Sequence, residues 1–384
     1  MKRSGIASLR SLKSNNNTNN TMSEQLISQD RIASSGEKNR IDFFDLAKGF
    51  CIFLVVIYHV SVRYEVELPA SNIMKSIRLP LYFFLSGCFF KTYGGLLDFV
   101  IRKLNKLLLP FVFWFLFSFL FAFFLFVFFD IQYFTTFYQL NIHSVVVNTL
   151  HGDYPNVYVW FLLCLFWVNL IFYTSHLLSG KFDKKLQPLA IGLLSIIIGV
   201  VGVTFSNYGI EVPFYIDSAF TSVPFFAFGY YSFRFTALAK KNKMDKWIPL
   251  FVILFVLFLY FVAPKYDLRS NSGISYQNVW LIYLCGFLGV LSVVLLSKMI
   301  RKLPLVSFWG RYSIMILVSH GIVFKFVSVL ISSSISKIIE MNSVELFVLN
   351  LFFTMSICTL LIPFMKKYMP HVTAQKDIIP VGNR

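Results

Sequence analysis

Apolar runs of about 20 residues recur along this chain between residues 44 and 365, and they constrain its fold more than any other feature. A helix of about 20 apolar residues crosses the hydrocarbon core of a bilayer, because it rises about 1.5 Å per residue. Only 14% of the 384 residues are charged and 57% are hydrophobic, whereas soluble domains carry about 25% charged residues. We therefore expect an all-α integral membrane protein with its helices in one bundle.

The polar residues between these runs separate ten predicted membrane-spanning helices. The second span is short, so it can be tilted or partly re-entrant. The predicted ranges are 44–63, 77–93, 107–129, 157–177, 187–205, 216–235, 247–263, 277–297, 311–331 and 344–365.

Lysine and arginine follow every second span, which predicts the orientation of the chain. The intervening loops 130–156 and 206–216 contain no lysine or arginine. Because cytoplasmic loops carry the excess of cations, this pattern predicts that both termini are cytoplasmic. The cations that follow spans two, four, six, eight and ten include Lys91, Arg102, Lys103, Lys106, Lys181, Lys184, Lys185, Arg234, Lys240, Lys241, Lys243, Lys246, Lys298, Arg301, Lys302, Lys366 and Lys367.

The domain organisation and the general class of partner follow from composition. Residues 1–40 are rich in Ser and Asn without an apolar period, so we expect a disordered cytoplasmic tail, a transmembrane domain over 41–367 and a cytoplasmic tail over 368–384. The net charge of +17 is typical of cations that flank membrane spans, which favours contact with membrane lipid over nucleic acid. The five cysteines lie in apolar runs without the spacing of metal ligands, so we expect no metal site.

The first predicted helix carries a cation and a histidine on one face. Lys48 and His59 are eleven residues apart, which is close to three turns, so they share a face and lie about 16 Å apart along the axis. Asp45 lies on the same face, one turn before Lys48. Ionisable groups inside membrane helices usually have a function, and a neutral histidine can act as a general base. The alternative is a histidine that a neighbouring helix satisfies.

Two further groups of polar residues are candidates for chemistry. His320 is a second histidine inside a predicted span, and Ser313 shares its face; helix packing explains His320 as well as catalysis does. Arg102, Lys103 and Lys106 directly precede the third span. They can bind the phosphates of an anionic cytosolic ligand, although cations at a membrane edge also contact anionic lipid.

Two expectations concern local helix geometry. Gly87 and Gly229 lie in bulky aromatic runs, where small residues permit close approach of helices. In a continuous helix over 311–331, Arg311 would point away from the face that carries His320.

Taken in order, six segments of the chain resemble the acyltransferase 3 family of multipass membrane acyltransferases, particularly its polysaccharide and fucose O-acetylase-like members. The resemblance covers nearly all of residues 40–365. The segments are DFFDLAKGFCIFLVVIYH, PLYFFLSGCFF, IRKLNKLLLPFVFW, VWFLLCLFWVNLIF, PFFAFGYYSFRF and GRYSIMILVSH.

The resemblance implies transfer of an acyl group, usually acetyl, from cytosolic acyl-CoA to a hydroxyl of a glycan or lipid-linked sugar. Acetyl-CoA would be a substrate, with no permanently bound cofactor. The family's catalytic histidine corresponds to His59, and its basic pair before the third span corresponds to Arg102 and Lys103, which Lys106 extends. Family members carry an arginine at the position of Lys48, and lysine keeps that charge but loses the bidentate fork. These four cations would bind the CoA phosphates.

Some assignments stay open at this point. Ser86 and His320 are candidate donors to the oxyanion, and Asp45 is a further candidate site residue. We expect a multipass protein of the cytoplasmic (inner) cell membrane, with its acceptor and oligomeric state undetermined. The alternatives are a transporter or flippase of a lipid-linked sugar, for which the chain lacks a convincing internal repeat, and a non-catalytic membrane component of glycan assembly.

Overall fold

The computed structural model of the chain describes a mainly helical protein. It covers residues 41–68, 70–129, 154–236, 238–240, 242–332 and 340–381. The predicted tail over 1–40 and nearly all of the predicted loop over 130–156 lie outside the described residues. Within them, the regular elements are helices, and one isolated β-bridge joins Asp267 to Ser272. The prediction of an all-α protein is confirmed for this part of the chain.

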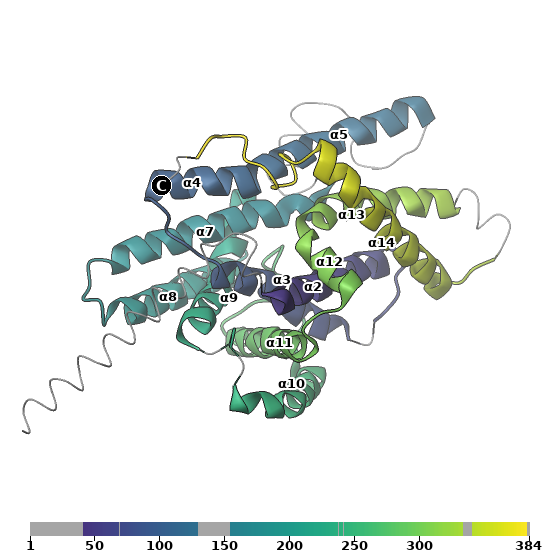
Figure 1. The fold of residues 1–384 in the computed structure, drawn as a ribbon. Helices are drawn as coiled ribbons and strands as arrows, with labels where there is room; N and C mark the ends of the chain where they lie inside the picture. The colour runs from purple at the N-terminus through teal and green to yellow at the C-terminus, as the bar shows by residue number, and fades with distance from the viewer. Residues whose placement is uncertain are drawn as a thin grey trace, which may run out of the picture.

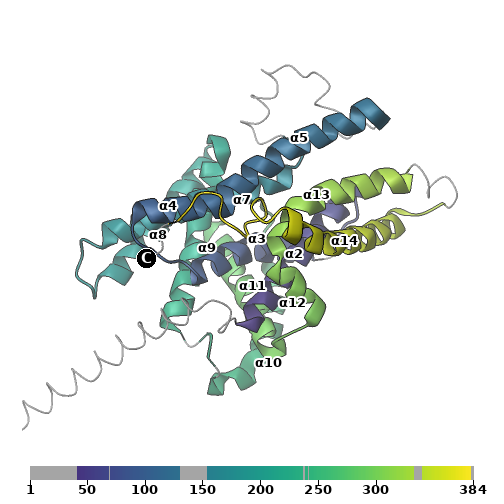
Figure 2. The ribbon, with the colours of Figure 1, turned by 45° about the horizontal axis from the view of Figure 1, so that its top comes forward.

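Each of the ten predicted spans falls on a helix. These helices are α2 (Asp42–Arg63), α3 (Ser71–Cys88), α5 (Leu109–Phe129), α7 (Trp160–Ser179), α8 (Gln187–Asn207), α9 (Ile216–Phe235), α10 (Ile248–Val262), α11 (Val279–Ile300), α13 (Ser313–Leu330) and α14 (Ser343–Tyr368). The shorter elements are α4 (Leu96–Lys103), α12 (Pro304–Arg311), the π-helical turn η1 (Leu104–Leu108), and the 3₁₀ turns η2 (Val157–Val159), η3 (Pro213–Tyr215) and η4 (Lys243–Trp247). Figure 1 and Figure 2 both show α4 and α5 on one side, α10 on the other, and α2 and α3 between them.

Eight helical stretches in the described part of the chain are long and apolar enough to cross a membrane. The remaining two of the ten, α3 and α9, are the interior helices: twelve of the 18 residues of α3 and twelve of the 20 residues of α9 are buried. In α10, by contrast, two of 15 residues are buried. A helix that faces other helices needs less apolar sequence than one that faces lipid. The count of ten spans and the orientation of the termini stay predictions.

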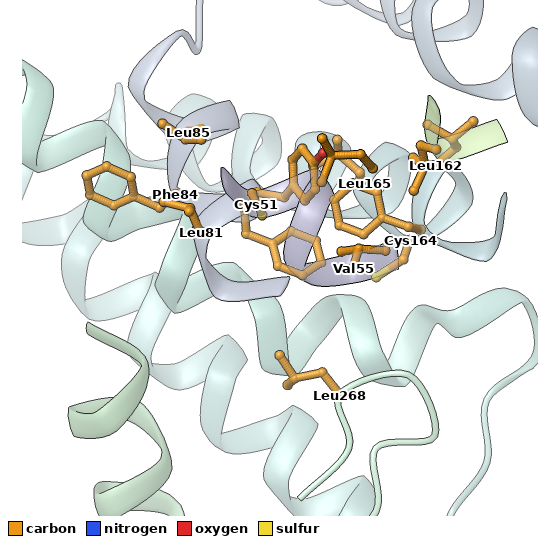
Figure 3. Packing of buried hydrophobic residues seen from close by; sticks show 14 of the residues in the cluster. Cys51, Val55, Leu81, Phe84, Leu85, Leu162, Cys164, Leu165 and Leu268 are labelled. Atoms are coloured by element: carbon orange, nitrogen blue, oxygen red, sulfur yellow. The ribbon is translucent and has the colours of Figure 1, made fainter. Parts of the chain in front are cut away.

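The helices α3 and α9 approach each other closely at two glycines, as predicted. A Cβ atom added at Gly87 would lie 1.9 Å from the carbonyl oxygen of Phe226, and one added at Gly229 would lie 1.9 Å from that of Phe84. Any side chain at either position would therefore separate the two backbones. The crossing holds α3 against the core. Figure 3 shows this core where side chains of α2, α3 and α7 meet, including Cys51, Val55, Leu81, Phe84, Leu85, Leu162, Cys164 and Leu165.

The helices α4 and α5 form one rod that is interrupted only by η1. Pro110, the second residue of α5, has no N–H for the carbonyl four residues earlier, and its ring crowds that carbonyl. The π-helical turn before it widens the backbone spiral at this place, which accommodates the proline. The same turn carries Lys106, which lines a cavity described below.

The ninth predicted span, 311–331, begins two residues later in the structure, at Ser313, because α12 and α13 are separate helices and Arg311 ends α12. The residue between them, Tyr312, has φ −114° and ψ 28°, so the backbone bends there. A Cβ atom at Gly310 would lie 1.7 Å from the carbonyl oxygen of Asp45, which shows how closely α12 packs on α2. This contact directs α12 away from the axis of α13. Arg311 and His320 therefore lie on different helices, and the expectation that Arg311 points away from the face of His320, which assumed one continuous helix, does not apply.

The α10–α11 loop, residues 263–278, is held against α8 and α9 by side-chain hydrogen bonds. The Asn271 amide donates to the carbonyl oxygen of Gly202 at 3.0 Å, and the Ser218 hydroxyl donates to that of Arg269 at 2.9 Å. The loop also contributes buried apolar side chains to the core. Its backbone is therefore anchored at several points, and the side chains that it presents have defined positions.

The chain after α14 returns alongside α4 and α5, where it is drawn in yellow (Figure 1). The Asn105 side-chain oxygen accepts hydrogen bonds from the backbone N–H groups of Ile378 and Ile379, each at 2.9 Å. The Trp114 indole N–H donates to the carbonyl oxygen of Val372 at 2.9 Å. These bonds fix the C-terminal segment on η1 and α5.

Candidate functional site

A cavity of about 220 Å³ has His59 in its wall, and we call it the histidine cavity. Side chains from α2, α3, η2, α7, α13 and the α10–α11 loop line it. Three of them are charged: Arg78 of α3, and Asp267 and Arg269 of the loop. A proton acceptor and several charged groups thus face one small space inside the bundle.

A second cavity, of about 450 Å³, is lined by Lys48, Lys103 and Lys106, and we call it the lysine cavity. Ser86 and Arg311 also line it, so it collects four cations. Among the described residues that line it, none carries a carboxylate. The electrostatic potential in this cavity is therefore positive, which favours an anionic ligand.

The two cavities adjoin, because Tyr82, Phe161 and Leu317 line both of them. The face of α3 runs from one to the other: Ser86 lines the lysine cavity, Tyr82 lines both, and Arg78 lines the histidine cavity. These three residues are spaced by four, so each lies about one turn from the next on the same face. Lys48 and His59, predicted to share a face of α2, line successive cavities in the same way.

Aromatic rings surround the imidazole of His59. Its ring centroid lies 4.3 Å from that of Tyr158, 5.4 Å from that of Tyr58 and 5.6 Å from that of His320. Tyr158 packs closely on α13, since a Cβ atom at Gly321 would lie 2.1 Å from its Cδ2 atom. His59 itself remains partly exposed to the cavity. The imidazole is thus held by ring contacts and is still accessible.

His320 is fully buried behind His59, and it lines neither cavity. Its Nδ1 atom lies 3.0 Å from the carbonyl oxygen of Ile316 and 2.8 Å from that of Leu317. Because carbonyl oxygens only accept hydrogen bonds, Nδ1 carries the proton and Nε2 is an acceptor in the neutral ring. Nε2 has no hydrogen-bond partner among the described residues. Neutral His320 therefore has no second N–H to offer an oxyanion, and its position is that of a ring packed against His59.

Lys48 and Lys103, which line the lysine cavity, each lie over a phenylalanine ring. Their Nζ atoms are 5.2 Å from the ring centroids of Phe89 and Phe99, respectively. A cation over an aromatic face is attracted by the ring quadrupole. These contacts position two positive charges from α2 and α4 toward the same space.

Lys106 connects the lysine cavity to the C-terminal segment. Its Nζ atom lies 2.9 Å from Oδ1 of Asp377 and donates to the carbonyl oxygen of Ala374, also at 2.9 Å. Both side chains of the ion pair are partly exposed, at 42% for Lys106 and 34% for Asp377. An anion in the cavity would therefore compete with Asp377 for this lysine.

Besides His320, two further candidate site residues from the sequence, Arg102 and Asp45, lie outside both cavities. The guanidinium carbon of Arg102 lies 4.6 Å from the ring centroid of Tyr93. Adjacent residues on a helix point about 100° apart. Because Lys103 points toward the cavity, Arg102 points away from it. Asp45 is buried where α2 meets α12. The structure thus brings Lys48, Lys103 and Lys106 together without Arg102.

The charged residues of the histidine cavity were not predicted from the sequence. Arg78 had a visible signal, since it is an arginine inside the predicted second span, 77–93. Asp267 and Arg269 carried none, because a polar loop between two spans is ordinary. Within the described residues, no group of three or more His, Cys, Asp or Glu side chains is arranged to hold a metal ion.

The Acyl_transf_3 family model, described as an acyltransferase domain, matches residues 41–363. The matched range contains every residue that lines either cavity. No curated protein and no solved structure matches the chain.

Proposed function

Because the chain belongs to the acyltransferase 3 family and is therefore a membrane acyltransferase, we propose that it transfers an acetyl group from cytosolic acetyl-CoA to a hydroxyl of a cell-surface glycan or lipid-linked sugar. The donor occupies the lysine cavity and the acceptor occupies the histidine cavity. One observation carries this proposal: a cationic cavity and a cavity with a histidine share a wall at Tyr82, Phe161 and Leu317.

The lysine cavity suits the phosphates of acetyl-CoA. Lys48, Lys103 and Lys106 supply charge-assisted hydrogen bonds, which are stronger than those between neutral groups. The thin pantetheine arm then extends past Tyr82 toward the histidine cavity. In this arrangement the thioester carbonyl reaches the place where the two cavities adjoin. The excess of cations in the predicted cytoplasmic loops supports a cytosolic opening for the donor and a location in the cytoplasmic membrane.

His59 is the general base in this proposal. It takes the proton of the acceptor hydroxyl while the hydroxyl oxygen attacks the thioester carbonyl carbon. The new C–O bond forms, the C–S bond breaks, and His59 returns the proton to the CoA thiolate. General-base assistance contributes about 10²–10⁴-fold to the rate. The alignment of the two substrates across the shared wall contributes further, because it makes the reaction effectively unimolecular.

The proposal is tested by supplying labelled acetyl-CoA to the cytosolic face of inverted membrane vesicles and measuring labelled glycan. His59→Gln should lower incorporation by about 100-fold or more while acetyl-CoA binding is kept. The matched control is His176→Gln, since His176 of α7 lines neither cavity. This variant should incorporate labelled acetyl into glycan at the rate of the unmodified protein. Normal labelling by His59→Gln would contradict the catalytic assignment and would favour a transporter or a non-catalytic component.

A further inference from the structure

We propose that the histidine cavity recognises an acceptor sugar that carries an anionic group, a carboxylate or a phosphate, and that Arg78 and Arg269 bind this group. The proposed function supplies the premise that the ligand of this cavity is the acceptor. The charged side chains that line the cavity do not depend on that premise, so binding of an anionic sugar can be tested without acyl transfer.

Arg78 is a buried arginine in the interior of the bundle. Its side chain comes from α3 and is 5% exposed. Its guanidinium carbon lies 3.5 Å from the ring centroid of Tyr58, directly before His59 in the chain. The Nε atom of Arg78 has no hydrogen-bond partner among the described residues. A buried guanidinium is favourable only where its N–H groups find partners. Because Arg78 lines the cavity, we infer that an anionic ligand there supplies a partner to this guanidinium.

Arg269 is held in the same cavity by the anchored α10–α11 loop. Its carbonyl oxygen accepts the hydrogen bond from Ser218, and its backbone N–H donates to Oδ1 of Asp267 at 2.8 Å. The Asp267 backbone is itself paired with Ser272 in the β-bridge. Asp267 and Arg269 therefore face the cavity from a backbone that is fixed before any ligand arrives. Such preorganisation reduces the entropy lost on binding.

The charges of the histidine cavity do not balance. Its lining contains two guanidinium groups, on Arg78 and Arg269, and one carboxylate, on Asp267. With His59 neutral, one positive charge is left over among the side chains that line this small cavity. A bound anion would neutralise it, and the planar arginine fork matches the geometry of a carboxylate or phosphate.

The size of the cavity limits the ligand to a small unit. Its volume of about 220 Å³ is below the range of about 300–1,000 Å³ that drug-sized ligands occupy. One sugar ring with its charged substituent is the unit that suits this space, while the rest of a glycan would extend outside. The recognised feature is therefore a single charged sugar rather than a long polysaccharide.

The test measures binding of three sugars that share one ring, without acyl-CoA: methyl β-glucoside, methyl β-glucuronide and methyl β-glucoside 6-phosphate. Titration calorimetry on the full chain in nanodiscs at low salt should show at least one charged sugar binding about tenfold tighter than the neutral one. The tighter of the two identifies carboxylate or phosphate as the preferred group. Arg78→Gln and Arg269→Gln should each remove this preference.

The matched control is Arg63→Gln, because Arg63 is an exposed arginine at the end of α2 that lines neither cavity. This variant should keep the preference for the charged sugar. Binding of CoA by every variant shows that the bundle and the lysine cavity are intact.

Equal binding of the three sugars, or no binding of any of them, would overturn the proposal. So would a preference that survives in both cavity variants. An equal loss of transfer to charged and neutral acceptors in Arg78→Gln, without a change in binding, would instead make Arg78 a donor to the oxyanion. If the preference holds but no acetyl transfer to any sugar occurs, the anion subsite stands and the proposed function fails.

Discussion

The two adjoining cavities hold their positive charges in different ways. In the lysine cavity three of the four cations are ammonium groups on flexible stems, and the fourth is Arg311. One of the three, Lys106, is shared with Asp377 at the edge of the bundle. In the histidine cavity the cations are guanidinium groups, one buried against Tyr58 and one on an anchored loop. Lysine acts as a mobile point charge, whereas arginine fixes the orientation of a planar partner. The larger cavity suits a donor that enters and leaves, and the smaller one suits an acceptor that must be aligned.

The most severe test of this division between a donor and an acceptor cavity is to block the place where the two cavities adjoin. Leu317→Trp adds a large ring where both cavities meet, so the thioester should no longer reach the acceptor. We expect single-turnover acetyl transfer to fall by about 100-fold, since a displacement of about 1 Å between reactants can have that effect. Acetyl-CoA binding, measured separately by calorimetry, should stay within about threefold.

The control for this variant is Leu317→Met, which keeps the volume and usually destabilises by less than about 1.5 kcal/mol. It should transfer acetyl at nearly the normal rate. Full transfer by Leu317→Trp in a folded protein would show that donor and acceptor do not meet at this wall.

The second test is to remove one charge from the lysine cavity. Lys103→Gln should raise KM for acetyl-CoA by about tenfold, because a charge-assisted hydrogen bond contributes about 1.5–3 kcal/mol, and kcat should change little. Steady-state kinetics with varied acetyl-CoA measure this. Lys184→Gln is the control, since Lys184 is exposed and lines neither cavity. A fall in kcat at unchanged KM would move Lys103 from donor binding to the chemical step.

The smallest effect is expected where the C-terminal segment meets the lysine cavity. Asp377→Asn removes the carboxylate that pairs with Lys106 and should make that lysine more available to the donor phosphates. Exposed ion pairs contribute about 0.2–1 kcal/mol, so the Kd of acetyl-CoA should fall by up to about fivefold. Salt should reduce the difference between variant and unmodified protein. Weaker binding of acetyl-CoA in Asp377→Asn would mean that the ion pair organises the cavity rather than competing with the ligand.

The resemblance and the structure divide the basic residues before α5 differently. The resemblance treats Arg102 and Lys103 as a pair, and Lys106 as an extension of it. In the structure Lys103 and Lys106 line the cavity, and Arg102 lies over Tyr93. Counting charges along a sequence identifies a basic cluster, but the helix direction and the π-helical turn select which of its members face a ligand.

The amino-acid sequence by itself determined the helices and several local relations along them. Apolar length predicted each long helix, the spacing of Lys48 and His59 put both on the face of α2 that lines the cavities, and Gly87 and Gly229 predicted a close helix crossing. These features depend on neighbours within one helix or on the size of one residue, so a local pattern is enough to predict them.

The tertiary structure decided which distant residues share a cavity. Arg78 of α3 lines the same cavity as Asp267 and Arg269 of the α10–α11 loop. They come together because hydrogen bonds anchor that loop on α8 and α9, which are separate segments of the chain. Likewise, the bend at Tyr312 follows from the packing of α12 on α2. Contacts between elements depend on the packing of the whole bundle, which no single segment encodes. The local pattern therefore identified His59, and only the packed bundle placed charged groups beside it.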